Sequence, residues 1–184
     1  MGLDMYLEKK TYVENWSHMK GSELTKIQIS GDKAKGIRPE RITYVTEQIA
    51  KWRKANAIHR WFVENVQEGK DDCGEYAVGS DQLKELAELC RKVLAEAKTK
   101  KARIKVGMQY SKGKTKAITE MGLKVTNPEA CEKLLPTQSG FFFGGTEYDN
   151  YYIDDLKYTA ETIEEALKEC EKGAHGTFYY SSSW

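Results

Sequence analysis

The spacing of apolar residues changes from segment to segment in this chain, and that change limits the fold more than any other feature. Residues 3–7 and 102–110 alternate between apolar and polar side chains, which indicates strands with one buried face. Residues 39–67, 81–97 and 149–171 instead repeat apolar side chains every three or four positions, which is typical of helices packed against a core. A chain with both periods combines a sheet with helices.

We therefore expect an α+β fold, with a small, mostly antiparallel sheet packed by about three long helices in a single domain over residues 1–184. Residues 177–180 have high strand propensity and are expected to close the sheet beside residues 2–8. Residues 102–119 are predicted to form a hairpin insertion. Asn127-Pro128-Glu129 starts a predicted short helix over 128–135.

Composition narrows the class of protein. The chain has 184 residues, 40% of them hydrophobic, so it can bury a core, and its net charge is only +1. We therefore expect no bulk binding of nucleic acid.

No apolar run approaches the roughly 20 residues that cross a bilayer, and the N-terminus lacks a signal-peptide pattern, so we expect a cytoplasmic protein without a membrane partner. The four cysteines form no close pair, so we expect reduced thiols, no metal and no cofactor.

The first candidate site is a polar pair in an apolar stripe. Asn56 and His59 lie where a helix over 39–67 would place core residues. An unsatisfied polar group costs about 1–3 kcal/mol when buried, so both side chains need partners. One interpretation is an internal hydrogen-bonded pair. The other is a pocket in which they bind a ligand, while Arg53 or Arg60 reaches its phosphate or carboxylate.

The second candidate site is the segment over residues 135–144, in which glycines flank three phenylalanines, together with the tyrosines that follow it. Glycine permits close approach of the backbone to a ligand, and phenylalanine offers a face on which a planar base can stack. Three consecutive phenylalanines cannot all face inward on a strand. Such a cluster is nevertheless more often core than a ligand platform. Here the candidates for ligand contact are Ser139, Phe141, Phe143, Tyr148 and Tyr152.

A third feature is a basic run without any acidic residue between Ala97 and Thr119. Its cations could attract phosphates, or they could pair with the acidic stretch from Glu147 to Glu171. A solvated face is the usual explanation of such a run.

Several segments resemble one family. Residues 1–7 (MGLDMYL), 52–62 (WRKANAIHRWF), 71–76 (DDCGEY) and 135–144 (LPTQSGFFFG) are similar to a group of small uncharacterised proteins of bacteriophages and some bacteria. The resemblance implies no established activity. Its phage context favours a counter-defence role, since small phage proteins of that kind often act by stoichiometric binding.

The leading hypothesis is a non-enzymatic protein that binds a small phosphorylated, nucleotide-like ligand and so sequesters a host signalling nucleotide. The residues expected to bind it are Arg53, Asn56, His59, Arg60, Ser139, Phe141, Phe143, Tyr148 and Tyr152. The alternative is a protein–protein inhibitor of a host enzyme. A third hypothesis is a nucleotide hydrolase that uses His59, Cys73 and the Asp71/Asp72 pair. The aromatic C-terminal strand is compatible with a monomer and with a homodimer.

Overall fold

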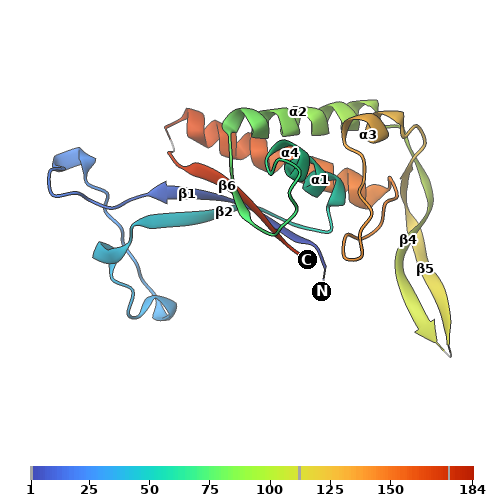
Figure 1. Cartoon of the computed structure of the whole chain (residues 1–184), viewed down its shortest axis with the longest axis horizontal. Coiled ribbons are helices and arrows are strands. Elements are labelled where there is room, and N and C mark those ends of the chain that lie inside the picture. Colours follow the sequence, from blue (N-terminus) through green and yellow to red (C-terminus); the bar gives the residue numbers. More distant parts are fainter. Residues whose placement is uncertain (1, 112, 174) are drawn as a thin grey trace.

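The structure is a computed structural model that describes residues 2–111, 113–173 and 175–184. It has an α+β fold, in which helices cover one face of a four-stranded antiparallel sheet and a separate two-stranded ribbon projects from one end (Figure 1). In spatial order the sheet consists of β2 (Tyr44–Arg53), β1 (Asp4–Tyr12), β6 (Thr177–Ser183) and β3 (Glu75–Val78). The ribbon pairs β4 (Thr99–Ser111) with β5 (Lys114–Val125). The helices are α1 (Asn56–Asn65), α2 (Ser80–Glu96), α3 (Glu129–Leu134) and α4 (Asn150–Glu171).

The central strand β1 shows the alternation that the sequence predicted. Met5 and Leu7 are fully buried under the helices, whereas Tyr6 and Glu8 on the other face are only half-buried. Strand β6 pairs antiparallel with β1, with Leu7 opposite Tyr180. The two ends of the chain therefore meet in the middle of the sheet, as the propensity of residues 177–180 indicated.

Helices α2 and α4 form the layer above the sheet, and both lie where the apolar spacing predicted them. The Arg91 guanidinium binds both carboxylate oxygens of Glu164 at 2.8 and 2.9 Å, which joins the two helices at their surface. Helix α4 begins after Asp149, whose carboxylate accepts hydrogen bonds from the backbone N–H groups of Tyr151 and Tyr152. This N-cap fixes the start of the longest helix.

The prediction of one helix over residues 39–67 is wrong. Residues 39–41 form a short 3₁₀ helix, β2 follows, and only Asn56–Asn65 are α-helical. Strand β2 pairs with β1, and Ala50 and Trp52 point together into the core at the two-residue period of a strand. Lys54 has φ +63°, a left-handed conformation that separates strand from helix.

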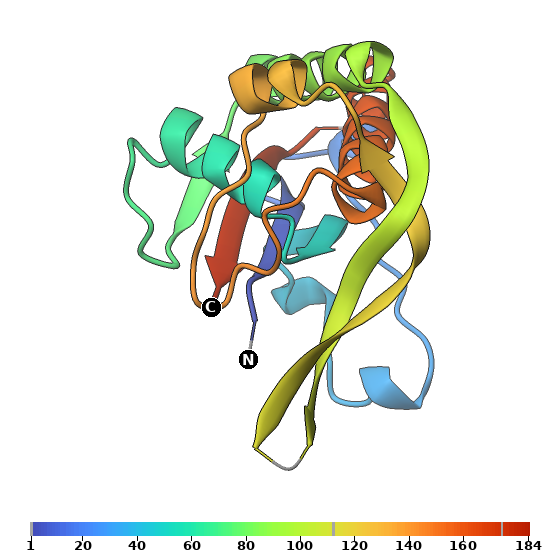
Figure 2. The same cartoon turned by 90° about the vertical axis from the view of Figure 1, so that its right-hand side faces the viewer.

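Two segments extend away from the layered body. The ribbon β4–β5 is longer than the predicted hairpin, and its outer half projects beyond the helices (Figure 2). At the opposite end, β1 and β2 continue beyond the sheet into an irregular segment over residues 13–43, which contains three short 3₁₀ helices. Among the described residues, none of the helices combines the length and apolarity needed to cross a bilayer.

Candidate functional site

His59 lies in the core and has a partner on each ring nitrogen. Its Nδ1 is 2.7 Å from the hydroxyl of Tyr180, and its Nε2 is 3.0 Å from Oδ2 of Asp71. Burial is the main reason why the pKa of Tyr180 is raised well above its ordinary value, and Asp71 adds to the effect. The phenol therefore donates to Nδ1, and we assign the imidazole proton to Nε2, which donates to Asp71.

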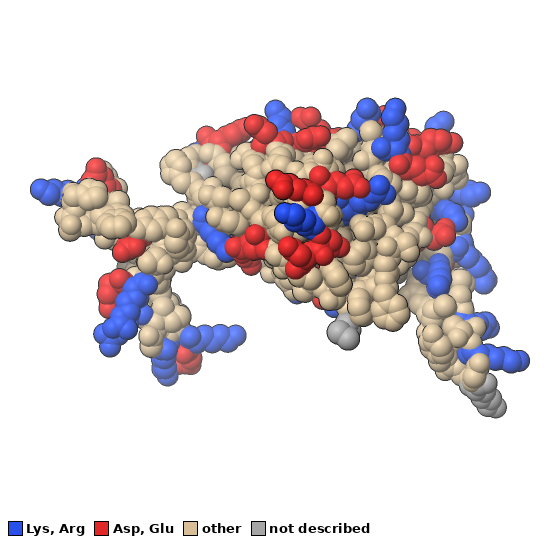
Figure 3. Space-filling view, in the orientation of Figure 1, with Lys and Arg blue, Asp and Glu red and all other residues tan. Residues whose placement is uncertain are grey.

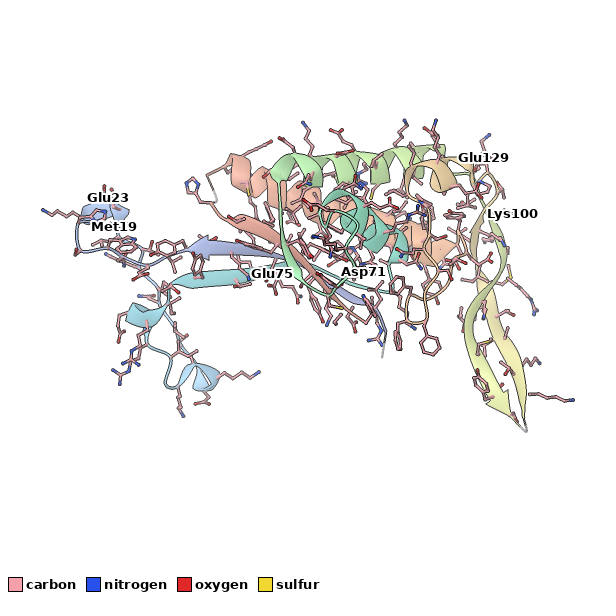
Figure 4. The ribbon with its side chains drawn as sticks, in the orientation of Figure 1. Met19, Glu23, Asp71, Glu75, Lys100 and Glu129 are labelled. Atoms are coloured by element: carbon pink, nitrogen blue, oxygen red, sulfur yellow. The ribbon has the colours of Figure 1, made fainter. Side chains whose placement is uncertain are left out.

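The surroundings of His59 close its imidazole from solvent, whereas the Asp71 side chain is 22% exposed. The rings of His59 and Phe143 meet in a T-shaped contact with 5.1 Å between centroids. Asp71, labelled in Figure 4 in the loop after α1, also accepts a hydrogen bond from Nε1 of Trp184 at 3.0 Å. Both imidazole nitrogens are occupied, so neither is available to activate the exposed thiol of Cys73.

Asn56 also has internal partners, and it holds a loop in place. Its side-chain N–H groups donate to the carbonyl oxygens of Phe143 and Gly145 at 2.9 and 2.8 Å. Its Oδ1 accepts from the backbone N–H of Gln138 at 3.0 Å. One buried side chain thus joins the start of α1 to both arms of the segment between α3 and α4.

That loop borders a cavity of about 340 Å³, within the size range of small-molecule sites. The first turn of α1 forms one side, Gly144 and Gly145 form another, and the first turns of α4 close the floor. The lining side chains that bear charge or an aromatic ring are Arg53, Lys54, Lys105, Glu147, Asp149, Asp155, Tyr151 and Tyr152. The middle of β4 supplies Lys105, so elements far apart in sequence meet here.

The three acidic side chains of the cavity are not equivalent. Glu147 pairs with Lys124 at 2.9 Å, and Asp149 caps α4. Burial, reinforced by Asp154 and Asp149, raises the pKa of Asp155 to about 7. Asp155 is therefore only partly ionised near neutral pH, which reduces the negative charge that opposes the three cations of the cavity. Of these cations, Arg53 also lies 3.5 Å from Oδ1 of Asp4.

The structure distributes the nine predicted site residues over three environments. Arg53, Asn56 and Tyr152 line the cavity. His59, Phe143 and Tyr148 pack in or against the core behind it. The remaining three lie at the surface or its edge: Ser139 is exposed, Phe141 is 95% exposed, and half-buried Arg60 pairs with Glu64 at 2.7 Å. The predicted residues thus do not form one common site.

Of the cavity lining, only Arg53, Asn56 and Tyr152 were among the predicted site residues, so several of its charged and aromatic side chains were missed. Lys105 belongs to the basic run, for which phosphate attraction and a solvated face were both open, and only the tertiary fold brings it beside α1. Tyr151 and Asp155 flank the apolar stripe of α4 one turn apart, next to Tyr152 and Leu156. Polar side chains at the edge of a buried stripe were the available signal, because that edge borders the cavity.

Comparisons with protein families, curated proteins and solved structures found no match to this chain. Within the described ranges, no three His, Cys, Asp or Glu side chains gather as ligands for a metal ion. The candidate site is therefore defined by its own geometry.

Proposed function

We propose that the cavity beside α1 binds a small phosphorylated, nucleotide-like ligand and holds it without chemical change. The observation that carries this proposal is the convergence of Arg53, Lys54 and Lys105 on one concave surface. Each cation can form charge-assisted hydrogen bonds to phosphate oxygens. The first turn of α1 borders the same space, and the N–H groups at the start of a helix favour an anion.

The same cavity offers apolar contact for the rest of the ligand. Tyr151 is 53% exposed at its rim, and the ring of Tyr152 forms part of its wall. A planar base can stack on the exposed ring of Tyr151 while its phosphate faces the cations. In this proposal Asn56 and His59 act indirectly, because they hold the loop and helix that shape the cavity.

Sequestration in the host cytoplasm, as a phage counter-defence activity, is the wider role that we attach to this site. It rests on the sequence resemblance described above. A nucleotide that is held rather than converted fits the imidazole of His59, since both of its nitrogens already have partners within the protein.

Calorimetric titration with a panel of linear and cyclic nucleotides tests the proposal. We expect one panel member to bind, and a variant with Arg53→Gln and Lys105→Gln to bind it at least 10-fold more weakly, since two charge-assisted contacts are lost. The control carries Lys84→Gln and Lys92→Gln on exposed positions of α2. Equal weakening by both double variants, or no binding of any nucleotide, would contradict the proposed site. A ³¹P spectrum that changes during incubation would contradict binding without conversion.

A second candidate function is docking on a protein partner, which an aromatic cluster at the far end of the sheet favours. Tyr12, Trp16 and Tyr44 are 41%, 51% and 57% exposed, and Tyr12 contacts both other rings, with centroids at 6.4 and 5.1 Å. Exposed tryptophan and tyrosine are typical binding hot spots. Retention of a host protein by the wild-type chain, lost with Trp16→Ala and Tyr44→Ala, is the expected result.

A further inference from the structure

The net charge of +1 conceals a strong separation of charge along the chain. Residues 99–125, which form the ribbon, contain eight of the 29 basic residues and one of the 28 acidic residues. The ribbon therefore carries a formal charge of +7, and the rest of the chain carries −6. Over the described surface, Lys and Arg gather on the projecting ribbon at the right of Figure 3.

Strand pairing sorts the ribbon into two faces. Lys101, Arg103 and Lys105 alternate along β4 and lie directly opposite Leu123, Met121 and Thr119 of β5. Directly opposed residues point to the same face of a ribbon. The one acidic residue, Glu120, lies opposite Ile104 and so belongs to the other face. The first face thus presents cations beside apolar side chains and no carboxylate.

The outer part of the ribbon is open on both faces. Past the register shift between Lys105 and Gly107, Met108 is 50% exposed and Tyr110 is 80% exposed. Ile118, on the other face, is 43% exposed. A two-stranded ribbon is marginally stable alone in water, so a surface that encloses both faces would stabilise it. Figures 1 and 2 agree that this part projects beyond the helices.

The ribbon's cations are largely uncommitted within the protein. Among the described residues of β4 and β5, only Lys124 forms an ion pair, with Glu147 at 2.9 Å. Lys100 is labelled in Figure 4 at the base of the ribbon. It has no carboxylate within salt-bridge distance in the described part of the chain, and the same holds for Lys101, Arg103, Lys105, Lys114 and Lys116. Their positive potential is available to an external anion.

We propose that the ribbon β4–β5 binds the backbone of duplex nucleic acid, with its outer part in a groove. Each strand of 12 or 13 residues is about 40 Å long, and the major groove of about 12 Å admits a two-stranded ribbon. Cations at two-residue intervals suit a linear polyanion. Lysine is depleted in protein–protein interfaces, so this surface suits phosphates better than an acidic protein.

This inference is independent of the proposed function of the cavity. It departs from the expectation, based on the net charge of +1, that the protein does not bind nucleic acid in bulk. The net charge of the whole chain is close to zero because the positive charge of the ribbon and the negative charge of the rest of the chain nearly cancel. The phosphate backbone responds to the local density of cations on the surface it contacts, and that density is high on the ribbon.

Fluorescence anisotropy with the full chain and a labelled 24-base-pair DNA duplex of mixed sequence tests it. We expect binding at 50 mM salt, with an affinity that falls linearly on a log–log plot against salt concentration. The variant K101Q/R103Q/K116Q should bind at least 10-fold more weakly, with a salt slope smaller by about 2–3. The control K84Q/K92Q/K168Q removes three exposed lysines of α2 and α4 and should bind as the wild type does.

Three results would overturn the inference. One is no duplex binding at 50 mM salt, and another is equal affinity of the ribbon variant and its control. The third is that the protein does not bind DNA but self-associates in sedimentation velocity, in a salt-sensitive way that K101Q/R103Q/K116Q abolishes. That result would mean that the ribbon binds the acidic surface of a second copy. An equal affinity for single-stranded DNA would overturn the placement in a groove. The variant keeps Arg53, Lys54 and Lys105, so nucleotide binding in the cavity reports separately on the proposed function.

Discussion

The hydroxyl of Tyr180 lies 2.7 Å from Nδ1 of His59, although 121 positions separate the two residues in the chain. This bond joins β6, the strand beside β1, to the helix that covers it. The Tyr180 ring also stacks on Phe62 of the same helix, with 3.9 Å between centroids and a 7° angle between planes. One side chain therefore fixes α1 on the sheet by packing and by a hydrogen bond.

Tyr180→Phe separates these two contributions. The substitution keeps the stacked ring but leaves Nδ1 of His59 buried without its donor, which should lower the free energy of unfolding by about 1–3 kcal/mol. Tyr179→Phe, at the half-buried neighbouring position, should change it by less than about 0.5 kcal/mol. Urea denaturation measures both, and equal effects would show that the Tyr180–His59 bond contributes nothing specific.

Asn56→Ala should destabilise the protein because it removes three hydrogen bonds from the loop before α4. The carbonyl oxygens of Phe143 and Gly145 lose their donor, and the N–H of Gln138 loses its acceptor. We expect a loss of about 2–4 kcal/mol in the free energy of unfolding. Asn65→Ala, at the exposed end of the same helix, is the control and should cost under about 1 kcal/mol. A loss of equal size in the two variants would contradict the role of Asn56 as a clamp.

Adjacent glycines provide a matched pair in the cavity wall. Gly144 has φ +88°, and a Cβ atom there would lie 3.0 Å from Cβ of Lys54. Gly144→Ala should therefore cost about 1–2 kcal/mol and weaken ligand binding, because the loop must shift. A Cβ atom at Gly145 meets open space, so Gly145→Ala should stay within about 0.5 kcal/mol of the wild type. Thermal and urea denaturation of the pair check this order, and a reversed order would contradict it.

Asp155 should make stability and anion binding depend on pH. Burial, followed by Asp154 and Asp149, raises its folded-state pKa to about 7 from an ordinary value near 4. Between these pH values the folded state binds more protons than the unfolded state, so this contribution to stability is lost as pH rises from about 4 to about 7. At pH 8, Asp155→Asn should be more stable than the wild type by roughly 1–3 kcal/mol, with little difference near pH 4.

Unfolding free energies measured at pH 5 to 8 test this dependence, with Glu165→Gln, exposed on the same helix, as the control. The wild-type curve should fall across this range more steeply than that of Asp155→Asn. The affinity for a phosphorylated ligand should fall over the same range, because ionised Asp155 repels phosphate. Parallel stability curves for the wild type and Asp155→Asn would contradict the raised pKa.

The spacing of apolar residues was enough to predict an element wherever that spacing fits only a helix or only a strand. The alternation over 102–110 and the stripes over 81–97 and 149–171 correspond to β4, α2 and α4. It failed over 39–67, where Val45, Ile49 and Trp52 match a helical period. Pairing with β1 and the positive φ of Lys54 decide that segment, and neither is a local signal.

The candidate site shows the same division. The sequence indicated that Asn56 and His59 are buried and need partners, and the structure confirms both features. It could not indicate which partners, because Gly145 and Tyr180 lie 89 and 121 positions away. The cavity depends on Lys105, which reaches α1 only after the ribbon is anchored to the body.

The anchoring of that ribbon has a consequence for how this protein can diversify. The backbone N–H of Thr126 donates to the carbonyl oxygen of Lys98 at 2.8 Å, and the Asn127 side chain bonds to Glu96 and Lys98. The chain therefore leaves and re-enters the body at nearly the same point. Paired insertions or deletions beyond Val106, which lines the cavity together with Lys105, would lengthen or shorten the outer ribbon without altering the sheet or its helices. The outer ribbon is thus a module that evolution can exchange while the cavity keeps its lining.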